Sequence, residues 1–481
     1  MAGKILQTYY RYVIRNISSV KLEPVLIISH NTVFKRWKFG FPKLTPQQVN
    51  TILKTYEKTE EIDHLAGAVK SFDTNQLPSN NPIEDRRCEG RCVDTTGLLF
   101  GVFDGHAGSA CAEIVSQRIF NYLAASFIPR DLLIDYAKVF AEGGNPELIK
   151  MYNKRVTLPS ELSTLYSKSF NRFVYELMED DNSNFDMAKT MEKAFLRLDK
   201  DISDEALLCE NPKLQSDLLS IAASGSVACV AHIDGPHLHI ANVGDCRAVL
   251  GVLDENNEWM PNCLTTEHNY ENTKEVNRIL SEHPPNERQS VIKHDRLLGQ
   301  LEPLRAFGDC RYKWSLSLQK DHFVPLFGHQ CLPPNYHTPP YLTARPEVTY
   351  HRLMPRDRFL VMATDGLWDQ ISVHKVIHLV GEYMRGRQTL DLLQLPNKNM
   401  KLREVKELLE QRREGLKSKL VDANAATHLI RNALGGTEYG VEHSMLSQML
   451  CYSDDVVRLI RDDITITVVF FDSEYLRHCP V

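Results

Sequence analysis

The sequence predicts an α/β (α+β) fold whose strands pair mainly antiparallel. Short apolar runs rich in β-branched and aromatic residues recur between Phe72 and Phe471, and many of them end in Asp or Gly. Runs of this length and composition are typical of buried strands. Two of them follow one another within residues 226–250 with no helical stretch between them. This arrangement favours antiparallel pairing over a doubly wound parallel sheet.

The periodicity of apolar residues predicts the individual elements. Strands are expected at 97–103, 226–233, 238–243, 359–363 and 464–471. Helices are expected where apolar residues recur every three or four positions, at 47–60, 109–125, 187–208, 272–281 and 374–384. The densely charged stretch 402–420 is expected to form a solvated helix.

Composition separates a short basic segment from one large folded part. The first 40 residues hold seven Lys or Arg residues and a single acid, Glu23, among Ser, Thr and Asn. This predicts an organelle transit peptide over 1–45, with a mobile basic tail as the alternative. One catalytic domain is expected over 46–475. Inserts are expected near 141–185, 320–341 and 385–420. Such segments are often docking surfaces or lids, and the alternative is variable surface loops.

Charge, hydropathy and cysteine spacing exclude several classes of protein. The net charge of -6 argues against a general nucleic-acid binder. No apolar run approaches the roughly 20 residues of a membrane-spanning helix. The 11 cysteines lack the paired spacing of a zinc site. They fit free thiols in a reducing compartment.

The strongest local signal is the segment 101–108, in which an apolar strand leads into Asp104, Gly105 and His106. The Asp104 carboxylate and the Gly105 carbonyl are oxygen ligands of the kind that Mg²⁺ and Mn²⁺ prefer. Taken alone, an Asp-Gly pair indicates only a turn.

Similar acidic residues recur beside other predicted strands. They are Glu84, Asp85, Asp245, Asp365, Asp369, Asp462 and Asp463. If these strand ends converge, the crowded carboxylates require cations. Two divalent ions about 4 Å apart can activate a bridging water and polarise a phosphoryl oxygen. The pattern therefore predicts metal-assisted hydrolysis of a phosphate ester.

Seven ordered segments resemble the motifs of the metal-dependent (type 2C, or PPM) Ser/Thr protein phosphatases. They are 84–86, 103–108, 224–228, 242–247, 305–309, 363–369 and 461–463. The resemblance covers roughly residues 70–472. It implies a central sandwich of two antiparallel sheets flanked by helices, in a four-layer α-β-β-α order.

The resemblance also implies roles for the acidic residues. Asp104 matches the residue that bridges two metal ions, and the carbonyl of Gly105 completes the shell of one of them. Asp365 and Asp462 match ligands of the other ion. The family usually has Asp-Asn in the last motif, so Asp463 is a departure that leaves the choice between Asp462 and Asp463 open, with Asp462 favoured.

The remaining matched acids contribute less directly. Glu84 and Asp85 match residues that bind metal-coordinated water. Asp245 and Asp369 match residues associated with a weaker third metal.

Two further residues are expected to face the substrate. His106 matches the proposed general acid for the leaving seryl oxygen, a role that suits a side chain with a near-neutral pKa. The alternative is a turn histidine. Many members of the family hold the substrate phosphate with an arginine four residues before the Glu-Asp pair, where this chain has Asn80. Asn80 is therefore the candidate substrate-binding residue, in a site that holds phosphopeptide differently.

The segments 72–87, 304–309 and 461–471 look like one branch of the family, the pyruvate dehydrogenase phosphatases of mitochondria. This likeness implies a location in the mitochondrial matrix and a substrate, the phosphorylated E1α component of the pyruvate dehydrogenase complex. It also implies docking on lipoyl domains of the dihydrolipoamide acetyltransferase core, assisted in some members by Ca²⁺, and leaves room for a regulatory subunit. The chain contains no EF-hand loop.

Two alternatives remain. The chain could be a type 2C phosphatase with another substrate and compartment, or a catalytically dead scaffold that keeps the fold. Every matched acid is present in the chain, which disfavours the scaffold.

Overall fold

The computed structural model describes residues 43–479 except 63–66, 143, 145, 154–155, 180–184, 209–210, 391–400, 404, 407–408, 411–420 and 438–439. The expected transit segment lies almost wholly outside the described residues. The expected charged helix at 402–420 lies largely outside them, as does much of the expected insert at 385–420.

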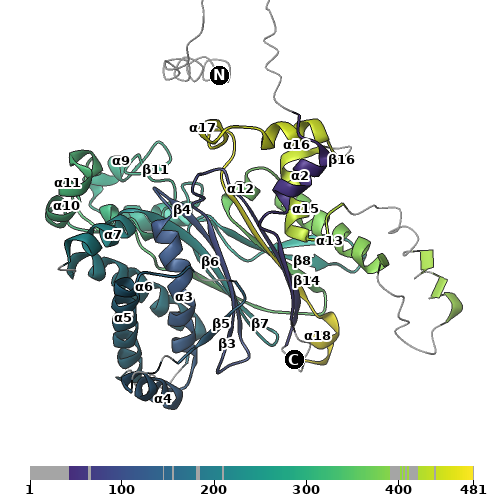
Figure 1. Cartoon of the computed structure of the whole chain (residues 1–481), viewed down its shortest axis with the longest axis horizontal. Helices are drawn as coiled ribbons and strands as arrows, with labels where there is room; N and C mark the ends of the chain where they lie inside the picture. The colour runs from purple at the N-terminus through teal and green to yellow at the C-terminus, as the bar shows by residue number, and fades with distance from the viewer. Residues whose placement is uncertain are drawn as a thin grey trace, which may run out of the picture. The chain divides into compact units, whose positions relative to one another are not determined.

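Two antiparallel sheets form the centre of the molecule (Figure 1). The six-stranded sheet has the order β1 (Lys58–Glu61), β2 (Val69–Leu77), β17 (Ile464–Phe471), β14 (Asp357–Ala363), β8 (Arg247–Leu253) and β9 (Trp259–Cys263). The seven-stranded sheet has the order β13 (Glu347–Arg352), β7 (His237–Val243), β6 (Gly225–Asp234), β4 (Leu98–His106), β3 (Arg86–Cys92) and β5 (Ile149–Met151), and β12 (Phe307–Gly308) pairs with β6. Two small hairpins pair β10 (Ile292–Lys293) with β11 (Arg296–Leu297) and β15 (Gly436–Thr437) with β16 (Gly440–Val441).

Helices cover both outer faces of this sandwich (Figure 1). Those of the first half of the chain are α2 (Pro46–Leu53), α3 (Ala110–Phe127), α4 (Arg130–Ala141), α5 (Ser160–Glu179), α6 (Met187–Leu208) and α7 (Pro212–Ala223). Those of the second half are α8 (Thr273–Glu282), α9 (Arg288–Val291), α10 (Leu316–His322), α11 (Val324–Phe327), α12 (Asp365–Trp368), α13 (Val373–Leu390), α15 (Ala425–Gly435), α16 (His443–Leu450), α17 (Asp454–Val457) and α18 (Ser473–His478).

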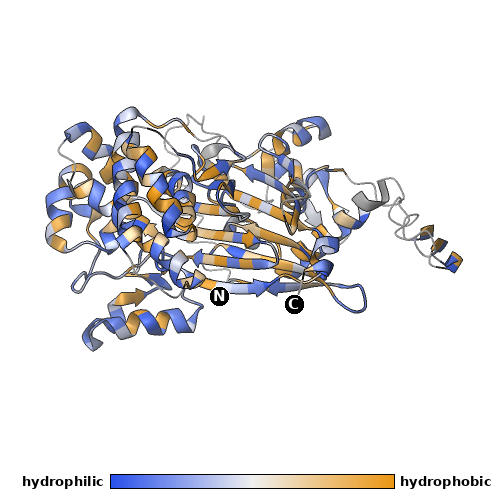
Figure 2. Ribbon diagram, turned by 90° about the horizontal axis from the view of Figure 1, so that it is seen from below, coloured by the Kyte–Doolittle hydropathy of each residue, from blue (hydrophilic) through white to orange (hydrophobic). Residues whose placement is uncertain are grey.

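Three apolar clusters hold the layers together. Between the sheets, Phe72 meets Phe100 edge-on with ring centroids 5.3 Å apart. A second cluster, which includes Phe120, joins the seven-stranded sheet to α3 and α6, and a third, which includes Phe359, joins the six-stranded sheet to α13 and α15. Figure 2 shows apolar residues along the inner strands and a mixture of apolar and hydrophilic residues on the outer helices. The expected four-layer α-β-β-α sandwich is confirmed.

Several sequence-based expectations were wrong in detail. The helix expected over 47–60 ends at Leu53, because the following residues form β1 and pair with β2. The strand expected to end at Phe103 continues to His106, since Asp104, Gly105 and His106 all pair with β6.

The insert expected at 141–185 is not wholly outside the core. It contains α5, whose Phe173 and Val174 are buried in the cluster beneath the seven-stranded sheet. The insert at 320–341 contains the rest of α10 and the short helix α11. Among the described helices, none combines the length and apolar character needed to cross a membrane.

Candidate active site

The acidic residues singled out in the sequence gather at one end of the sandwich around Asp104. Burial raises the pKa of Asp104 well above its usual value. Repulsion from four other carboxylates raises it further, and these belong, in decreasing order, to Asp85, Asp365, Asp245 and Asp462. Asp104 lies in the seven-stranded sheet, whereas Asp365 begins α12, one residue beyond the end of β14 in the six-stranded sheet, with Thr364 between them. The site is therefore built where the two sheets meet.

Asp365 has an oxygen atom that the protein leaves without a partner. Burial is the main cause of its raised pKa, followed by repulsion from Asp245, while a side-chain hydrogen bond with Asp104 opposes the shift. Its Oδ1 atom is buried and has no hydrogen-bond partner among the described residues. Burying an unpaired carboxylate oxygen is costly, so this atom is suited to contact a cation.

Glu84 and Asp85 are fixed by neighbouring donors. The backbone N–H of Gly108 donates to Glu84 Oε1 at 2.7 Å, and Thr364 Oγ1 donates to Asp85 Oδ2 at 2.8 Å. Burial raises the pKa of both carboxyl groups, and repulsion from Asp463 raises them further. Each carboxylate is thus held in place beside the site.

Both oxygens of the Asp463 carboxylate accept hydrogen bonds from the loop that precedes β3. Its Oδ1 accepts the backbone N–H groups of Ser79 at 2.5 Å and Asn80 at 2.8 Å. Its Oδ2 accepts the N–H of Glu84 at 2.7 Å. Asp463 therefore anchors a loop, and this geometry favours Asp462 over Asp463 as the residue that faces an ion.

Asn80 lies beside both of these aspartates. Its Nδ2 donates to Asp462 Oδ1 and to Asp463 Oδ2, each at 3.2 Å. Burial raises the pKa of Asp462, and the hydrogen bond from Asn80 opposes this shift without reversing it. Asn80 thus orients Asp462 in addition to the contact with substrate expected from the sequence.

The predicted acids Asp245 and Asp369 also have raised pKa values. Burial raises the pKa of Asp245 to about 6, with Glu267 and Glu302 raising it and His106 lowering it. Burial also raises the pKa of Asp369, which Glu302 raises further. Glu267 and Glu302 were not predicted as site residues, because neither follows a predicted strand.

The backbone at Gly105 leaves no room for a side chain. A Cβ atom there would overlap the carbonyl oxygen of Glu84 and touch Ala112. Glycine is therefore required for β4 to approach the loop before β3 this closely.

His106 is paired with an aspartate to which the sequence analysis gave no role. Its Nε2 lies 2.6 Å from Asp309 Oδ2. Burial lowers the pKa of His106, but the charge and hydrogen bond of Asp309 outweigh burial and the net shift is upward. Asp309 belongs to the matched segment 305–309, so its presence in a motif was the available signal.

A second missed residue is Arg461, which braces the loop before β3. It donates to Ser79 Oγ and, at 2.9 Å, to the carbonyl of Pro78. Burial lowers its pKa to about 10. Its position directly before Asp462 was the available signal.

The residues of this site fit a hard divalent cation. Their donors are carboxylate and carbonyl oxygens, the carboxylates repel one another, and Asp365 Oδ1 lacks a partner among the described residues. Within the described part of the chain, no three His, Cys, Asp or Glu side chains form a ready-made cage around one ion. Mg²⁺ commonly keeps several water ligands and needs only one or two carboxylates, so the two observations agree.

The fold and the site together define a metal-dependent phosphatase. The family model described as Protein phosphatase 2C matches residues 131–402, a range that contains Asp245, Asp365 and Asp369. The chain belongs to the protein phosphatase 2C family, whose members are metal-dependent phosphatases of phosphoserine and phosphothreonine.

Relatives with curated names match most of the chain. "[Pyruvate dehydrogenase [acetyl-transferring]]-phosphatase 1, mitochondrial" of Rattus norvegicus is 45% identical over 448 residues, which cover 89% of this chain and 83% of the relative. The corresponding phosphatase 2 of Homo sapiens is 41% identical over 90% of this chain and 84% of its own length. Phosphatase 1 of Saccharomyces cerevisiae is 29% identical over 89% and 73%.

Proposed function

We propose that this protein is a Mg²⁺- or Mn²⁺-dependent phosphatase that acts on the E1α component of pyruvate dehydrogenase and so activates the pyruvate dehydrogenase complex. The convergence of carboxylates around Asp104 carries the proposed chemistry. The substrate is supported by relatives named for this activity that match about nine tenths of the chain.

Two divalent ions are proposed to bind at the centre of the site. Asp104 would contact both ions, the carbonyl of Gly105 would complete the shell of one, and Asp365 and Asp462 would hold the other. When bound, such ions activate water and stabilise the charge of the phosphoryl oxygens. The partnerless Oδ1 of Asp365 supports its assignment as a ligand.

The surrounding acids are proposed to complete the metal shells. Glu84 and Asp85 orient water ligands, a role that fits carboxylates already held by Gly108 and Thr364. Asp245 and Asp369 are proposed to hold a weaker third ion.

His106 is proposed to protonate the leaving group. A seryl alkoxide is a strong base and leaves slowly unless a positioned acid supplies a proton. His106 lies two residues after Asp104 at the end of β4, and this closeness to the proposed metal ligand supports the acid role. Asn80 is proposed to contact the substrate while it orients Asp462.

The proposed location is the mitochondrial matrix, with residues 1–45 as the transit segment and residues 46–475 as the catalytic domain. Relatives named as mitochondrial support this location. A fusion of residues 1–45 to a fluorescent protein should enter mitochondria, and a cytosolic fusion would count against the proposal.

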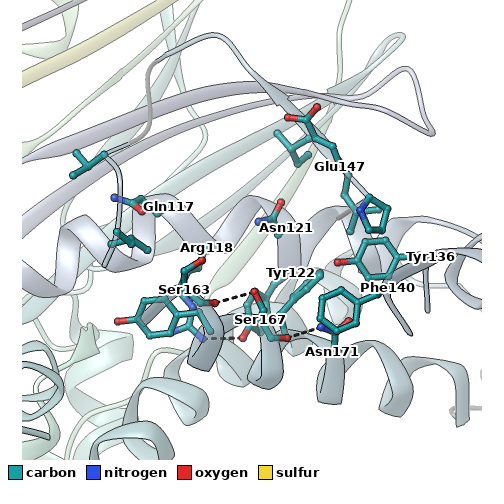
Figure 3. A pocket seen from close by; sticks show the side chains of 17 residues that line it. Gln117, Arg118, Asn121, Tyr122, Tyr136, Phe140, Glu147, Ser163, Ser167 and Asn171 are labelled. Atoms are coloured by element: carbon teal, nitrogen blue, oxygen red, sulfur yellow. Dashed lines mark hydrogen bonds between the residues drawn. The ribbon is translucent and has the colours of Figure 1, made fainter. Parts of the chain in front are cut away.

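The insert at 141–185 is proposed to dock a lipoyl domain of the acetyltransferase core. Its helix α5 borders a cavity of about 560 Å³ that α3 and α4 also line. Figure 3 shows Tyr136 and Phe140 beside Ser167 and Asn171 of α5. Ca²⁺ would act where the domain docks, and a regulatory subunit is a further proposed partner.

Replacement of Val156, which lines this cavity and is 59% exposed, tests the docking surface. Val156→Asp should slow dephosphorylation of the intact complex but not of a phosphopeptide. Val441→Asp in the hairpin strand β16, which packs near α15 and where Val441 is also exposed, is the matched control and should change neither.

The decisive experiment measures phosphate release from phosphorylated pyruvate dehydrogenase and from an unrelated phosphoprotein, with Mg²⁺ or with EDTA. Mg²⁺-dependent release that favours the dehydrogenase is the expected result. Release without that preference would retain the chemistry and reject the substrate. No release from either protein, with the protein folded and metal supplied, would favour the scaffold.

A further inference from the structure

Three strands bring His106 and Asp309 together across the seven-stranded sheet. In the register between β4 and β6, His106 is opposite Gly225. In the register between β6 and β12, Gly225 is opposite Gly308, the residue before Asp309. The pairing of His106 with Asp309, 203 residues later in the chain, is therefore set by sheet register.

Gly225 provides the space in which the two side chains meet. A Cβ atom at this position would overlap both His106 Nε2 and Asp309 Oδ2. The absence of a side chain on the middle strand lets the imidazole and the carboxylate approach within 2.6 Å over its backbone.

The backbone holds the Asp309 carboxylate in one direction. Asp309 has a φ of 48°, in the left-handed region that non-glycine residues rarely adopt. Its N–H donates to the carbonyl of Ser224 at 2.9 Å. The neighbouring N–H of Gly308 donates to Asp199 Oδ1 at 2.9 Å, and Lys313 also binds Asp199. The Asp309 side chain is only 3% exposed, whereas that of His106 is 26% exposed.

We propose that Asp309 is the positioning residue for His106. A carboxylate accepts hydrogen bonds, so the contact assigns a proton to Nε2 and fixes the plane of the ring. The other ring nitrogen, Nδ1, makes no hydrogen bond with any described residue and would be the atom that donates a proton to the leaving oxygen. This inference rests on the acid role proposed for His106. An aspartate that fixes the tautomer and orientation of a histidine has the same logic in serine proteases.

The step that Asp309 supports is one proton transfer. As the bond between phosphorus and the seryl oxygen breaks, the bonding electron pair stays on that oxygen and the Nδ1 proton joins it. The imidazole is left neutral, with its remaining proton on Nε2 and donated in the hydrogen bond to Asp309, and a proton from solvent then restores Nδ1–H. The attacking water supplies the oxygen of the released phosphate and gives up its proton to solvent.

A purely structural role for Asp309 makes a different prediction. If Asp309 only braces the turn after β12, its loss would slow every substrate equally. If it orients His106, its loss should matter only where the leaving group needs a proton. A seryl alkoxide needs one, whereas p-nitrophenolate is a weak base and leaves without one.

The test compares kcat for a phosphoserine peptide and for p-nitrophenyl phosphate at saturating Mg²⁺. Asp309→Asn should lower kcat for the peptide about 10- to 100-fold and kcat for p-nitrophenyl phosphate less than about 3-fold. Asp199→Asn is the matched control, because Asp199 holds the same turn through Gly308 and Lys313. Any loss in this control should be equal for both substrates. Asp309→Glu, which keeps the charge and displaces it, should give the same selective loss and serves if the Asn variant does not fold.

Each remaining outcome is decisive. Equal losses for both substrates in folded Asp309 variants would overturn the proposal and leave Asp309 as a structural residue. A His106→Gln variant should show the same selectivity as the Asp309 variants. If it shows none, the acid role itself is wrong and the positioning role falls with it. If His106→Gln lowers kcat more for the peptide than for p-nitrophenyl phosphate but the Asp309 variants do not, His106 is still the acid and only the positioning role of Asp309 is wrong.

Discussion

The carboxylate of Asp463 accepts the backbone N–H of Glu84 at 2.7 Å and joins segments 379 residues apart. The same carboxylate accepts the N–H groups of Ser79 and Asn80. One buried side chain thus sets the position of the loop that carries Glu84 and Asp85 into the site.

Removing this anchor should destabilise the fold. Because three of its hydrogen bonds join a charged group to backbone donors, Asp463→Ala should lower the free energy of unfolding by about 3 kcal/mol or more. Asp462→Ala should change it by less than about 1 kcal/mol and should weaken Mg²⁺ binding instead. Urea unfolding in EDTA and Mg²⁺ titration by calorimetry measure the two effects. A stable Asp463→Ala protein that has lost Mg²⁺ binding would reverse the two assignments.

Replacing Asp104 should separate activity from folding. Asp104→Asn removes a carboxylate that four neighbours repel, so the metal-free protein should be at least as stable as the wild type. Turnover should fall about 1000-fold or more, since the loss of a metal bridge raises the barrier by several kcal/mol. Mg²⁺ should raise the Tm of the wild type and not that of the variant. Near-wild-type turnover would contradict the assignment of this residue.

Asn80→Arg tests how the substrate phosphate is held. The new guanidinium would lie beside Asp462 and Asp463, where it can offer two parallel hydrogen bonds to phosphate. We expect an altered preference among phosphopeptides, measured as kcat/KM over a peptide panel. Asn80→Gln, which keeps an amide, is the control. Kinetics identical to those of the wild type would mean that position 80 does not face the substrate.

His232 should make the fold sensitive to acid at a distance from the site. Burial lowers its pKa to about 4, with Asp234 opposing the shift and His239 adding to it. Both ring nitrogens are buried without a hydrogen-bond partner among the described residues. An unfolded histidine has a pKa of about 6.5, so the unfolded state binds more protons below that pH. The contribution of His232 to stability is therefore fully present above pH 6.5 and is lost as the pH falls toward 4, by up to about 3 kcal/mol.

The variant His232→Phe should lose this part of the acid sensitivity. Its Tm relative to the wild type should rise steadily between pH 7 and pH 5. His237→Phe is the control, because His237 is exposed on the adjoining strand β7. A constant difference in Tm across this range would show that His232 does not carry the effect.

Helices and strands whose ends coincide with the ends of a periodic run of apolar residues were predictable from the sequence. The run that forms β17 and the amphipathic stretch that forms α6 have the expected bounds, Ile464–Phe471 and Met187–Leu208. The expected helix at 47–60 ends early because β1 pairs with β2. Strand β4 extends past Phe103 because β6 pairs with Asp104, Gly105 and His106. Pairing between strands overrides the local sequence signal for a turn or a helix. The spacing of apolar residues within one segment does not show which other segment it will pair with.

The candidate site, like the fold, has features that the sequence predicts and features that it does not. The acids were identifiable because each belongs to a short motif beside a strand. The pairs that these residues form were not predictable, because Asp309 reaches His106 through sheet register and Asp463 reaches Glu84 through the loop before β3. A carboxylate that binds a distant backbone donor leaves no pattern in its own neighbourhood of the sequence.

Asp104 and Asp365 are carried by opposite sheets, so their separation depends on the apolar side chains between the sheets, among them Phe72 and Phe100. A change in the volume of these side chains would shift one sheet against the other, since packed interiors transmit strain. The affinity for ions would then change although every residue of the site stayed the same. Mutations between the sheets and mutations in the site should therefore compensate for one another in evolution. A substitution between the sheets would restrict which substitutions the site can tolerate, and the reverse should also hold.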